Sequence, residues 1–117
     1  MVCLMDQAST IAVFKPSAQA LPVVLSCPHA GTMVPDDLVA ATTLDEATLI
    51  GATDFGVDAL VEPAAHALGV PLVSCLVARA YVDVNRSEDE IDTAMFKDID
   101  ALPPHRARSP RVMAGFG

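Results

Sequence analysis

The sequence predicts one α/β domain, with a mostly parallel or mixed sheet flanked by helices. The chain has 117 residues, of which 52% are hydrophobic and 19% are charged, and this length supplies one core rather than two. Short apolar runs are followed by a long helical pattern and then by another apolar run, an order that is typical of α/β proteins. We therefore expect residues 1–117 to form a single unit.

Two strands are expected near the start of the chain, at residues 10–14 and 22–26, where short apolar or β-branched runs are bounded by polar residues and prolines. The second run ends in the segment CPHAG at positions 27–31. Its proline lacks an amide donor and Gly31 allows unusual backbone angles, so we expect the chain to leave the sheet here. His29 would then lie at the C-terminal end of a strand, where open α/β sheets bind ligands.

A helical pattern extends over residues 44–68, and Gly69 provides a stop signal. Pro63 lies inside this pattern and should kink the helix or split it. Apolar residues recur along one face of the expected helix, at Val57, Leu60, Val61, Ala64, Ala65 and Leu68.

The apolar run at residues 71–77 is typical of a strand that is buried on both faces of a sheet. A further short strand is expected at residues 81–84. Residues 87–100 are acidic and weakly periodic, and residues 101–117 contain three prolines, three arginines and no acid. Because an α/β core would normally continue with another helix and strand, the sequence indicates an incomplete domain.

The charge balance disfavours several classes of partner. Fifteen acidic and seven basic residues give a net charge of −8, which repels nucleic-acid phosphates and anionic lipid. The three cysteines form no CxxC pair, and the pattern of a signal peptide is not seen. We therefore expect a cytoplasmic protein that binds a small molecule and neither nucleic acid nor membrane.

The placement of the arginines points to a binding site. No lysine or arginine occurs between Pro16 and Ala78, after which Arg79 and Arg86 flank a short apolar segment. A guanidinium removed from water needs an anion or another acceptor, so both arginines are candidate clamps for a carboxylate. An internal ion pair, with Asp83 or with an acid on the helix, explains their positions equally well.

His29 is a candidate metal ligand. A lone histidine is more often a structural residue, but the position on a turn after a strand favours a ligand role. Asp54 and Asp58 would share one face of a helix that begins near Thr53, and capping of that helix is the alternative explanation of their spacing. A thiol nucleophile at Cys27 is disfavoured, because no third group is evident to orient a Cys–His pair.

Several segments of the chain resemble, in order, the N-terminal half of the N-formylglutamate amidohydrolase family. The resemblance runs from about Pro22 to the last residue, and the PHxG and RxYVDVNR blocks are specific as a pair. Ala30 stands where the family commonly has serine, and a small residue is preserved there. The matching segments are SCPHAG at 26–31, VP at 34–35, TDF at 53–55 with Asp58 and Leu60, RAYVDVNR at 79–86 and RVMAGFG at 111–117.

The resemblance implies a zinc-dependent hydrolase with a phosphorylase/hydrolase-like α/β fold related to zinc carboxypeptidases and aspartoacylases. Such an enzyme cleaves the formamide of N-formylglutamate, or of a related N-acyl amino acid, to give formate and glutamate late in histidine breakdown. His29 and Asp54 are then the expected ligands of the metal, which is zinc or another divalent ion and which this incomplete chain can lack. Arg79 is expected to be catalytic, by polarising the scissile carbonyl. Arg79, Asn85 and Arg86 are expected to bind the substrate carboxylates, which suits the bidentate geometry of arginine.

In this family the remaining metal-binding histidine and the catalytic glutamate lie in the second half of the domain, so the resemblance implies a truncated chain with an incomplete site. We expect the side chains of His29 and Asp54 to meet at the C-terminal edge of the sheet. We also expect the chain alone to hydrolyse little or no N-formylglutamate with added zinc. The alternative function is a non-catalytic α/β module that uses the two arginines for anion binding or interaction.

Overall fold

The computed structural model describes residues 9–98, 100–102 and 110. The chain divides into two compact parts, Met1–Val84 and Asn85–Gly117, and each is described by itself. Among the described residues, the first part contains a three-stranded sheet and three helices, and the second contains the 3-10 helix η1 (Thr93–Met95). A single unit over residues 1–117 stays a prediction.

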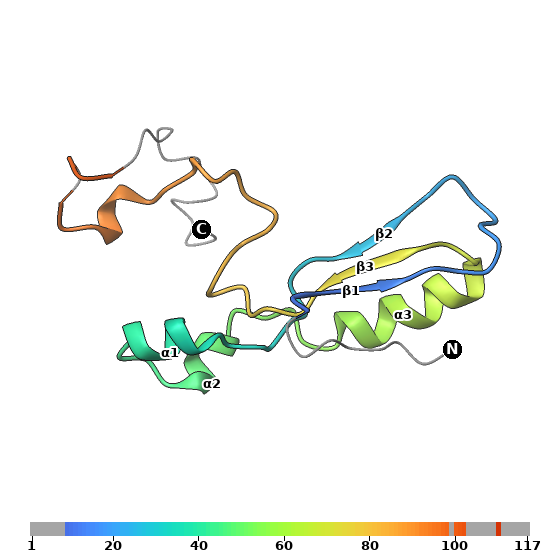
Figure 1. Ribbon diagram of the computed structural model, residues 1–117, viewed down its shortest axis with the longest axis horizontal. Helices are drawn as coiled ribbons and strands as arrows, with labels where there is room; N and C mark the ends of the chain where they lie inside the picture. Colours follow the sequence, from blue (N-terminus) through green and yellow to red (C-terminus); the bar gives the residue numbers. More distant parts are fainter. Residues whose placement is uncertain (1–8, 99, 103–109, 111–117) are drawn as a thin grey trace. The chain divides into compact units, whose positions relative to one another are not determined.

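The sheet of the first part is mixed. Its strands are β1 (Ile11–Phe14), β2 (Leu25–Cys27) and β3 (Leu72–Cys75), in the order β1-β3-β2 (Figure 1). Strand β3 is antiparallel to β1 and parallel to β2. The strands lie where the apolar runs predict them, although each is shorter than expected, and a mixed α/β sheet is confirmed. The chain between β1 and β2 does not form a hairpin, because β3 lies between these two strands in the sheet.

Residues 81–84 do not form the strand that was expected. The chain turns here: the amide of Tyr81 donates to the carbonyl of Ala78 at 2.9 Å, and the side chain of Arg79 donates to that of Asp83. In a strand, residues four apart are separated by about 13 Å. The short contact between Arg79 and Asp83 therefore requires a turn.

Three helices connect β2 to β3: α1 (Asp36–Ala41), α2 (Glu46–Ile50) and α3 (Val57–Leu68). The side chain of Asp45 caps α2 by accepting a hydrogen bond from the amide of Thr48 at 2.8 Å. Such a cap satisfies one of the amides that lack a partner at a helix N-terminus.

The long helical pattern is interrupted at residues 51–56 and not at Pro63, which lies inside a continuous α3. The expected split at the proline is therefore wrong. Gly56 precedes α3 with a φ of 77°, a conformation that glycine adopts at no steric cost. Gly69 ends α3 in the left-handed conformation, as the sequence predicts.

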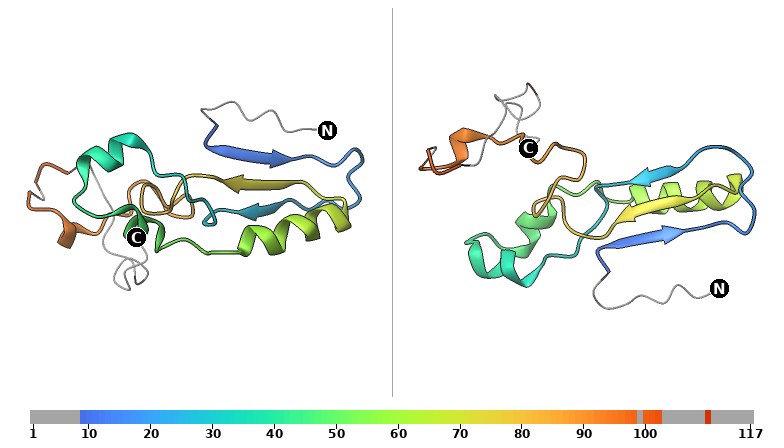
Figure 2. Two further views of the ribbon diagram at one scale, coloured as in Figure 1. Left: turned by 90° about the horizontal axis from the view of Figure 1, so that it is seen from below. Right: turned by 45° about the horizontal axis from the view of Figure 1, so that its top comes forward.

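Helix α3 packs against one face of the sheet, along β2 and β3 (Figure 2). The core at this interface contains Cys27, Ala65, Val70 and Leu72, with Phe14, Leu25, Val57 and Val61 packed around it. In the part of the chain that the structure describes, no helix has the length and apolar character needed to cross a membrane.

Candidate metal centre

The turn after β2 is held against the end of β3 by a close backbone approach at Gly31. A Cβ atom at this position would lie 2.3 Å from the carbonyl carbon of Leu76 and 2.5 Å from its oxygen. Just beyond, the amide of Met33 donates to the Leu76 carbonyl at 3.0 Å, and the amide of Ala78 donates to the Met33 carbonyl at 2.8 Å. Gly31 is therefore needed for space. Its φ is not positive, so the expected use of unusual backbone angles is wrong.

The loop before α3 is tied to the same turn. The buried hydroxyl of Thr53 donates to the Gly31 carbonyl at 3.1 Å, and the amide of Asp54 donates to the His29 carbonyl at 2.9 Å. These bonds place Asp54 beside His29. Asp54 and Asp58 were expected to share one face of a helix. This expectation is wrong, because α3 begins only at Val57 and Asp54 lies in the loop before it.

His29 lies between two carboxylates. Its Nδ1 is 3.6 Å from Oδ2 of Asp54, and its Nε2 is 2.7 Å from Oδ1 of Asp83. The side chains of His29 and Asp83 are each 9% exposed, whereas that of Asp54 is 52% exposed. The expected meeting of His29 and Asp54 beyond the C-terminal end of β2 is thus confirmed. Nδ1 of the imidazole faces the solvent-exposed carboxylate of Asp54.

Asp83 is also the partner of Arg79. The Nε and Nη2 atoms of Arg79 donate to Oδ2 of Asp83 at 3.0 and 2.8 Å. Both side chains are largely buried, at 16% and 9% exposed. The internal ion pair with Asp83, which the sequence left open, is therefore present. Three side chains in a row, His29, Asp83 and Arg79, link the ends of the two parallel strands.

These contacts decide which nitrogen of His29 carries the proton. A carboxylate that accepts two guanidinium bonds is ionised and can only accept, so Nε2 of His29 donates to Asp83. In the neutral ring, Nδ1 is then an acceptor whose neighbour is a second carboxylate, that of Asp54. Nδ1 of His29 and the carboxylate of Asp54 are both acceptors, so a cation between them stabilises the pair. This cation is either a proton on Nδ1 or a metal ion.

The donor set fits part of a zinc site. Two ligands at about 2.0–2.2 Å from one tetrahedral ion are about 3.4 Å apart, close to the 3.6 Å between Nδ1 of His29 and Oδ2 of Asp54. A metal-bound histidine usually donates its other ring N–H to a carboxylate, as His29 does to Asp83. Within residues 9–98, 100–102 and 110, no three His, Cys, Asp or Glu side chains are grouped to hold a metal.

Asn85 and Arg86, the other residues expected to bind substrate, belong to the second part of the chain. Nη1 of Arg86 donates to the backbone carbonyl of Asn85 at 3.2 Å. Their roles toward a substrate carboxylate stay predictions.

Cys27 is a core residue and not a nucleophile on the surface. It is 1% exposed, and burial, followed by the charge of Asp58, raises the pKa of its thiol above the ordinary value of 9.0. A raised pKa lowers the fraction of reactive thiolate. This agrees with the sequence analysis, which disfavours a thiol nucleophile at Cys27.

Sequence reasoning missed the contact between Asp83 and His29, and also the role of Thr53. Asp83 was considered only as a partner of Arg79, because the two are four residues apart, whereas His29 is 54 residues away. The signal that could have found it is the position of Asp83 in the segment that follows the apolar run of β3, six residues beyond the end of that run at Val77. Parallel strands end at the same edge of a sheet, so polar residues after β2 and β3 are expected to be neighbours.

The fold and the site together define an α/β protein whose histidine and carboxylates lie at the C-terminal edge of two parallel strands. The model of the N-formylglutamate amidohydrolase family matches residues 21–114. The chain belongs to this family.

A crystal structure of N-formylglutamate amidohydrolase from Ralstonia eutropha JMP134, at 2.00 Å resolution, is similar to this chain, with a TM-score of 0.75 and 32% sequence identity. The similarity covers 92% of this chain and 37% of that chain. The chain therefore spans little more than a third of the length of this solved structure. No match to the chain is found among curated proteins.

Proposed function

We propose that the chain carries part of the active site of a zinc-dependent amidohydrolase that acts on the formamide bond of N-formylglutamate or of a related N-acyl amino acid. The products from N-formylglutamate are formate and glutamate. The observation that carries the proposal is the position of His29, with Nε2 held by Asp83 and Nδ1 beside Asp54. Membership of the family and the activity named for the Ralstonia eutropha protein support the reaction class.

In this proposal Nδ1 of His29 and the carboxylate of Asp54 hold the ion. A bound zinc ion would act as a Lewis acid and would lower the pKa of water toward neutral pH. Asp83 keeps the proton on Nε2, so that Nδ1 presents its lone pair. Arg79 fixes the carboxylate of Asp83 through two hydrogen bonds. The geometry therefore supports Arg79 as a positioning residue, and its expected action on the scissile carbonyl stays a prediction.

Substrate binding is proposed for Asn85 and Arg86. N-formylglutamate has two carboxylates, and a guanidinium binds a carboxylate with two parallel hydrogen bonds. Neither nucleic acid nor anionic membrane is proposed as a partner, because the net charge of −8 repels both.

A catalytic zinc takes three protein ligands and a water molecule, and the described residues bring two ligands together. We propose that the third ligand and the general base come from the region of the family fold that corresponds to the rest of the Ralstonia eutropha chain. A relation to the zinc carboxypeptidases, a place in histidine breakdown and a cytoplasmic location belong to the same proposal.

Zinc binding tests the site directly. Calorimetric titration of the chain with zinc should show one site, weakened at least tenfold by either His29→Ala or Asp54→Ala. Asp83→Asn should weaken it by about 10–100-fold, as is usual for a partner of a metal-bound histidine. His66→Ala is the matched control, because its side chain lies on α3 and is 53% exposed. Zinc affinity that is equal in all four variants would overturn the proposal.

Formate release tests the reaction. The chain alone, with zinc, should release little formate from N-formylglutamate. A fusion of the chain to the unmatched region of the Ralstonia eutropha protein should release formate, and His29→Ala should abolish this activity. Binding of glutamate to the chain without zinc, lost on Arg86→Ala, would instead favour the anion-binding module.

A further inference from the structure

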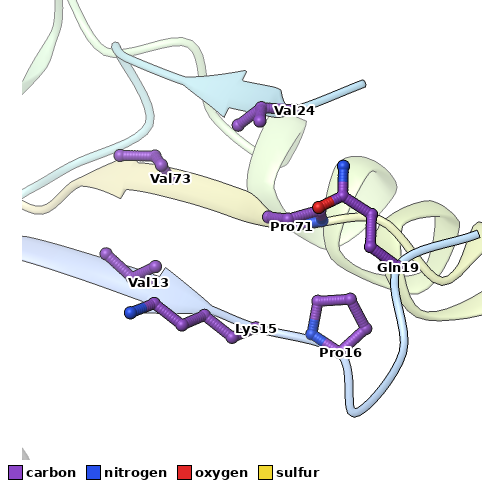
Figure 3. A pocket seen from close by; sticks show the side chains of 7 residues that line it. All are labelled: Val13, Lys15, Pro16, Gln19, Val24, Pro71 and Val73. Carbon is purple, nitrogen blue, oxygen red and sulfur yellow. The ribbon is translucent and has the colours of Figure 1, made fainter. Parts of the chain in front are cut away.

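The hollow shown in Figure 3 does not include the candidate metal centre. Its volume is about 440 Å³, and it is lined by residues of β1, of β3 and of the segments that flank the strands, among them Val13 and Val73. No residue of the centre belongs to this lining. The walls of this hollow therefore do not position His29, and the bonds within the loops around His29 do.

The turn that carries Asp83 follows β3, and its attachment decides where the carboxylate of Asp83 lies. The two bonds from Arg79 come from the same turn, so they fix this carboxylate relative to the turn and not relative to His29. At its start the turn is anchored by the backbone, because the amide of Ala78 donates to the Met33 carbonyl at 2.8 Å. A second attachment closer to Asp83 would hold its carboxylate against the ring of His29.

Tyr81 provides this second attachment. Its hydroxyl donates to Oδ2 of Asp37 at 2.7 Å, although the two residues are 44 positions apart in the chain. Asp37 lies in the first turn of α1, the helix that follows the turn of His29. The bond therefore joins the turn of Asp83 to the chain that leaves His29. Hydrogen bonds to an ionised carboxylate are about twice as strong as those between neutral groups.

The exposed position of this bond separates positioning from packing. Tyr81 is 45% exposed and Asp37 is also exposed, so removal of the hydroxyl opens no cavity in the core and leaves no buried polar group without a partner. We propose that Tyr81 is a positioning residue, which holds the carboxylate of Asp83 against Nε2 of His29 through its bond to Asp37. Its effect on zinc rests on the proposed function, whereas its effect on the imidazole does not.

The proton on Nε2 of His29 tests the positioning without zinc. Nuclear magnetic resonance of the zinc-free chain should show it as a resolved downfield signal, because the side chain is 9% exposed and the bond to Asp83 slows exchange with water. Loss of the signal in His29→Ala assigns it. Tyr81→Phe, which removes only the hydroxyl, and Asp37→Ala should each speed this exchange by about three- to tenfold.

Two variants of α1 provide the matched controls. Asp37→Asn should keep the exchange within about twofold of that in the unaltered chain, because the amide oxygen still accepts from the hydroxyl of Tyr81. Asp36→Ala removes the neighbouring carboxylate from the same first turn and should leave the exchange unchanged. The circular dichroism spectrum of each variant shows whether it folds.

Calorimetric titration with zinc measures the consequence at the proposed site. Tyr81→Phe and Asp37→Ala should each weaken zinc binding by about three- to tenfold, and the double variant should bind no more weakly than either single variant, because both changes break the same bond. Absence of the His29 signal in the unaltered chain, unchanged exchange in Tyr81→Phe and Asp37→Ala, or equally fast exchange in Asp36→Ala would overturn the proposal. The expected exchange rates in a chain that binds no zinc would support the positioning and contradict the proposed function.

Discussion

Substitution of Gly31 by alanine should damage both the fold and the candidate metal centre. The new Cβ would lie 2.3 Å from the carbonyl carbon of Leu76, and ordinary contact begins near 3.4 Å, so the two backbones must separate by about 1.1 Å, the difference between these distances. Overpacking of this kind costs about 1–3 kcal/mol.

The separation also acts on the hydrogen bonds that join the turn to its surroundings. The bonds from Met33 to Leu76 and from Thr53 to Gly31 are 3.0 and 3.1 Å long, and each contributes about 0.5–1.5 kcal/mol. Loss of one of them in addition to the overpacking gives a decrease of about 1.5–4.5 kcal/mol in the free energy of unfolding. The same movement shifts His29 away from Asp83, which lies on the segment after β3, and should weaken zinc binding because Asp83 no longer fixes the imidazole.

Urea denaturation followed by circular dichroism measures the stability change, and calorimetry measures zinc affinity. Gly51→Ala is the matched control, because Gly51 has a helical φ of −62° and its new Cβ would lie 3.1 Å from the Thr48 carbonyl oxygen. A shift of a few tenths of an ångström relieves that contact, so we expect a change below about 1 kcal/mol. A Gly31→Ala protein with the stability and zinc affinity of the unaltered chain would refute the reasoning from the close approach.

Three further predictions concern single side chains. Asp83→Ala should lower the free energy of unfolding by about 3 kcal/mol, because one partner of a buried ion pair is removed, whereas Glu62→Ala, at a side chain 66% exposed, should change it by less than about 1 kcal/mol. The pKa of Tyr81 should exceed 10.0, since its hydroxyl donates to Asp37 at 2.7 Å; phenolate absorbance reports it directly, as the chain has one tyrosine and no tryptophan, and Asp37→Ala should lower it. Burial raises the pKa of the Cys27 thiol above 9.0, so its contribution to stability is complete below that pH and is lost as pH rises through the raised pKa; urea unfolding on both sides of pH 9.0 should show a larger loss in the unaltered chain than in Cys27→Ala, in which the raised pKa of Tyr81 still acts.

Local signals in the sequence predict a good part of the fold. The stop of α3 at Gly69 follows from a glycine after an apolar stripe, and the three strands follow from short apolar runs. The position of His29 beyond β2 follows from the apolar run that ends just before Pro28. Each of these features depends on residues within a few positions of one another, which is why a sequence pattern can indicate them.

Features that depend on distant residues could not be predicted in the same way. The pattern at 81–84 favours a strand, but the ion pair between Arg79 and Asp83 requires a turn. Gly31 is a glycine because of Leu76, 45 residues along the chain, and not because of its own backbone angles. The proximity of Asp54 to His29 was expected from the resemblance to the family, whereas the helix on which Asp54 was placed does not reach it.

The hydrogen bond between His29 and Asp83 has a consequence for folding. These two residues are 54 positions apart in the chain, and the loop between them closes only when β2 and β3 are paired and their ends are adjacent. The unfolded chain therefore has no preformed site, and an ion that binds at His29 favours the native state. Such a ligand stabilises the native state by about 2.7 kcal/mol when its free concentration is about 100 times its Kd. Zinc at this centre would thus stabilise the folded chain in addition to any role in the reaction. The melting temperature of the chain would then depend on the zinc concentration.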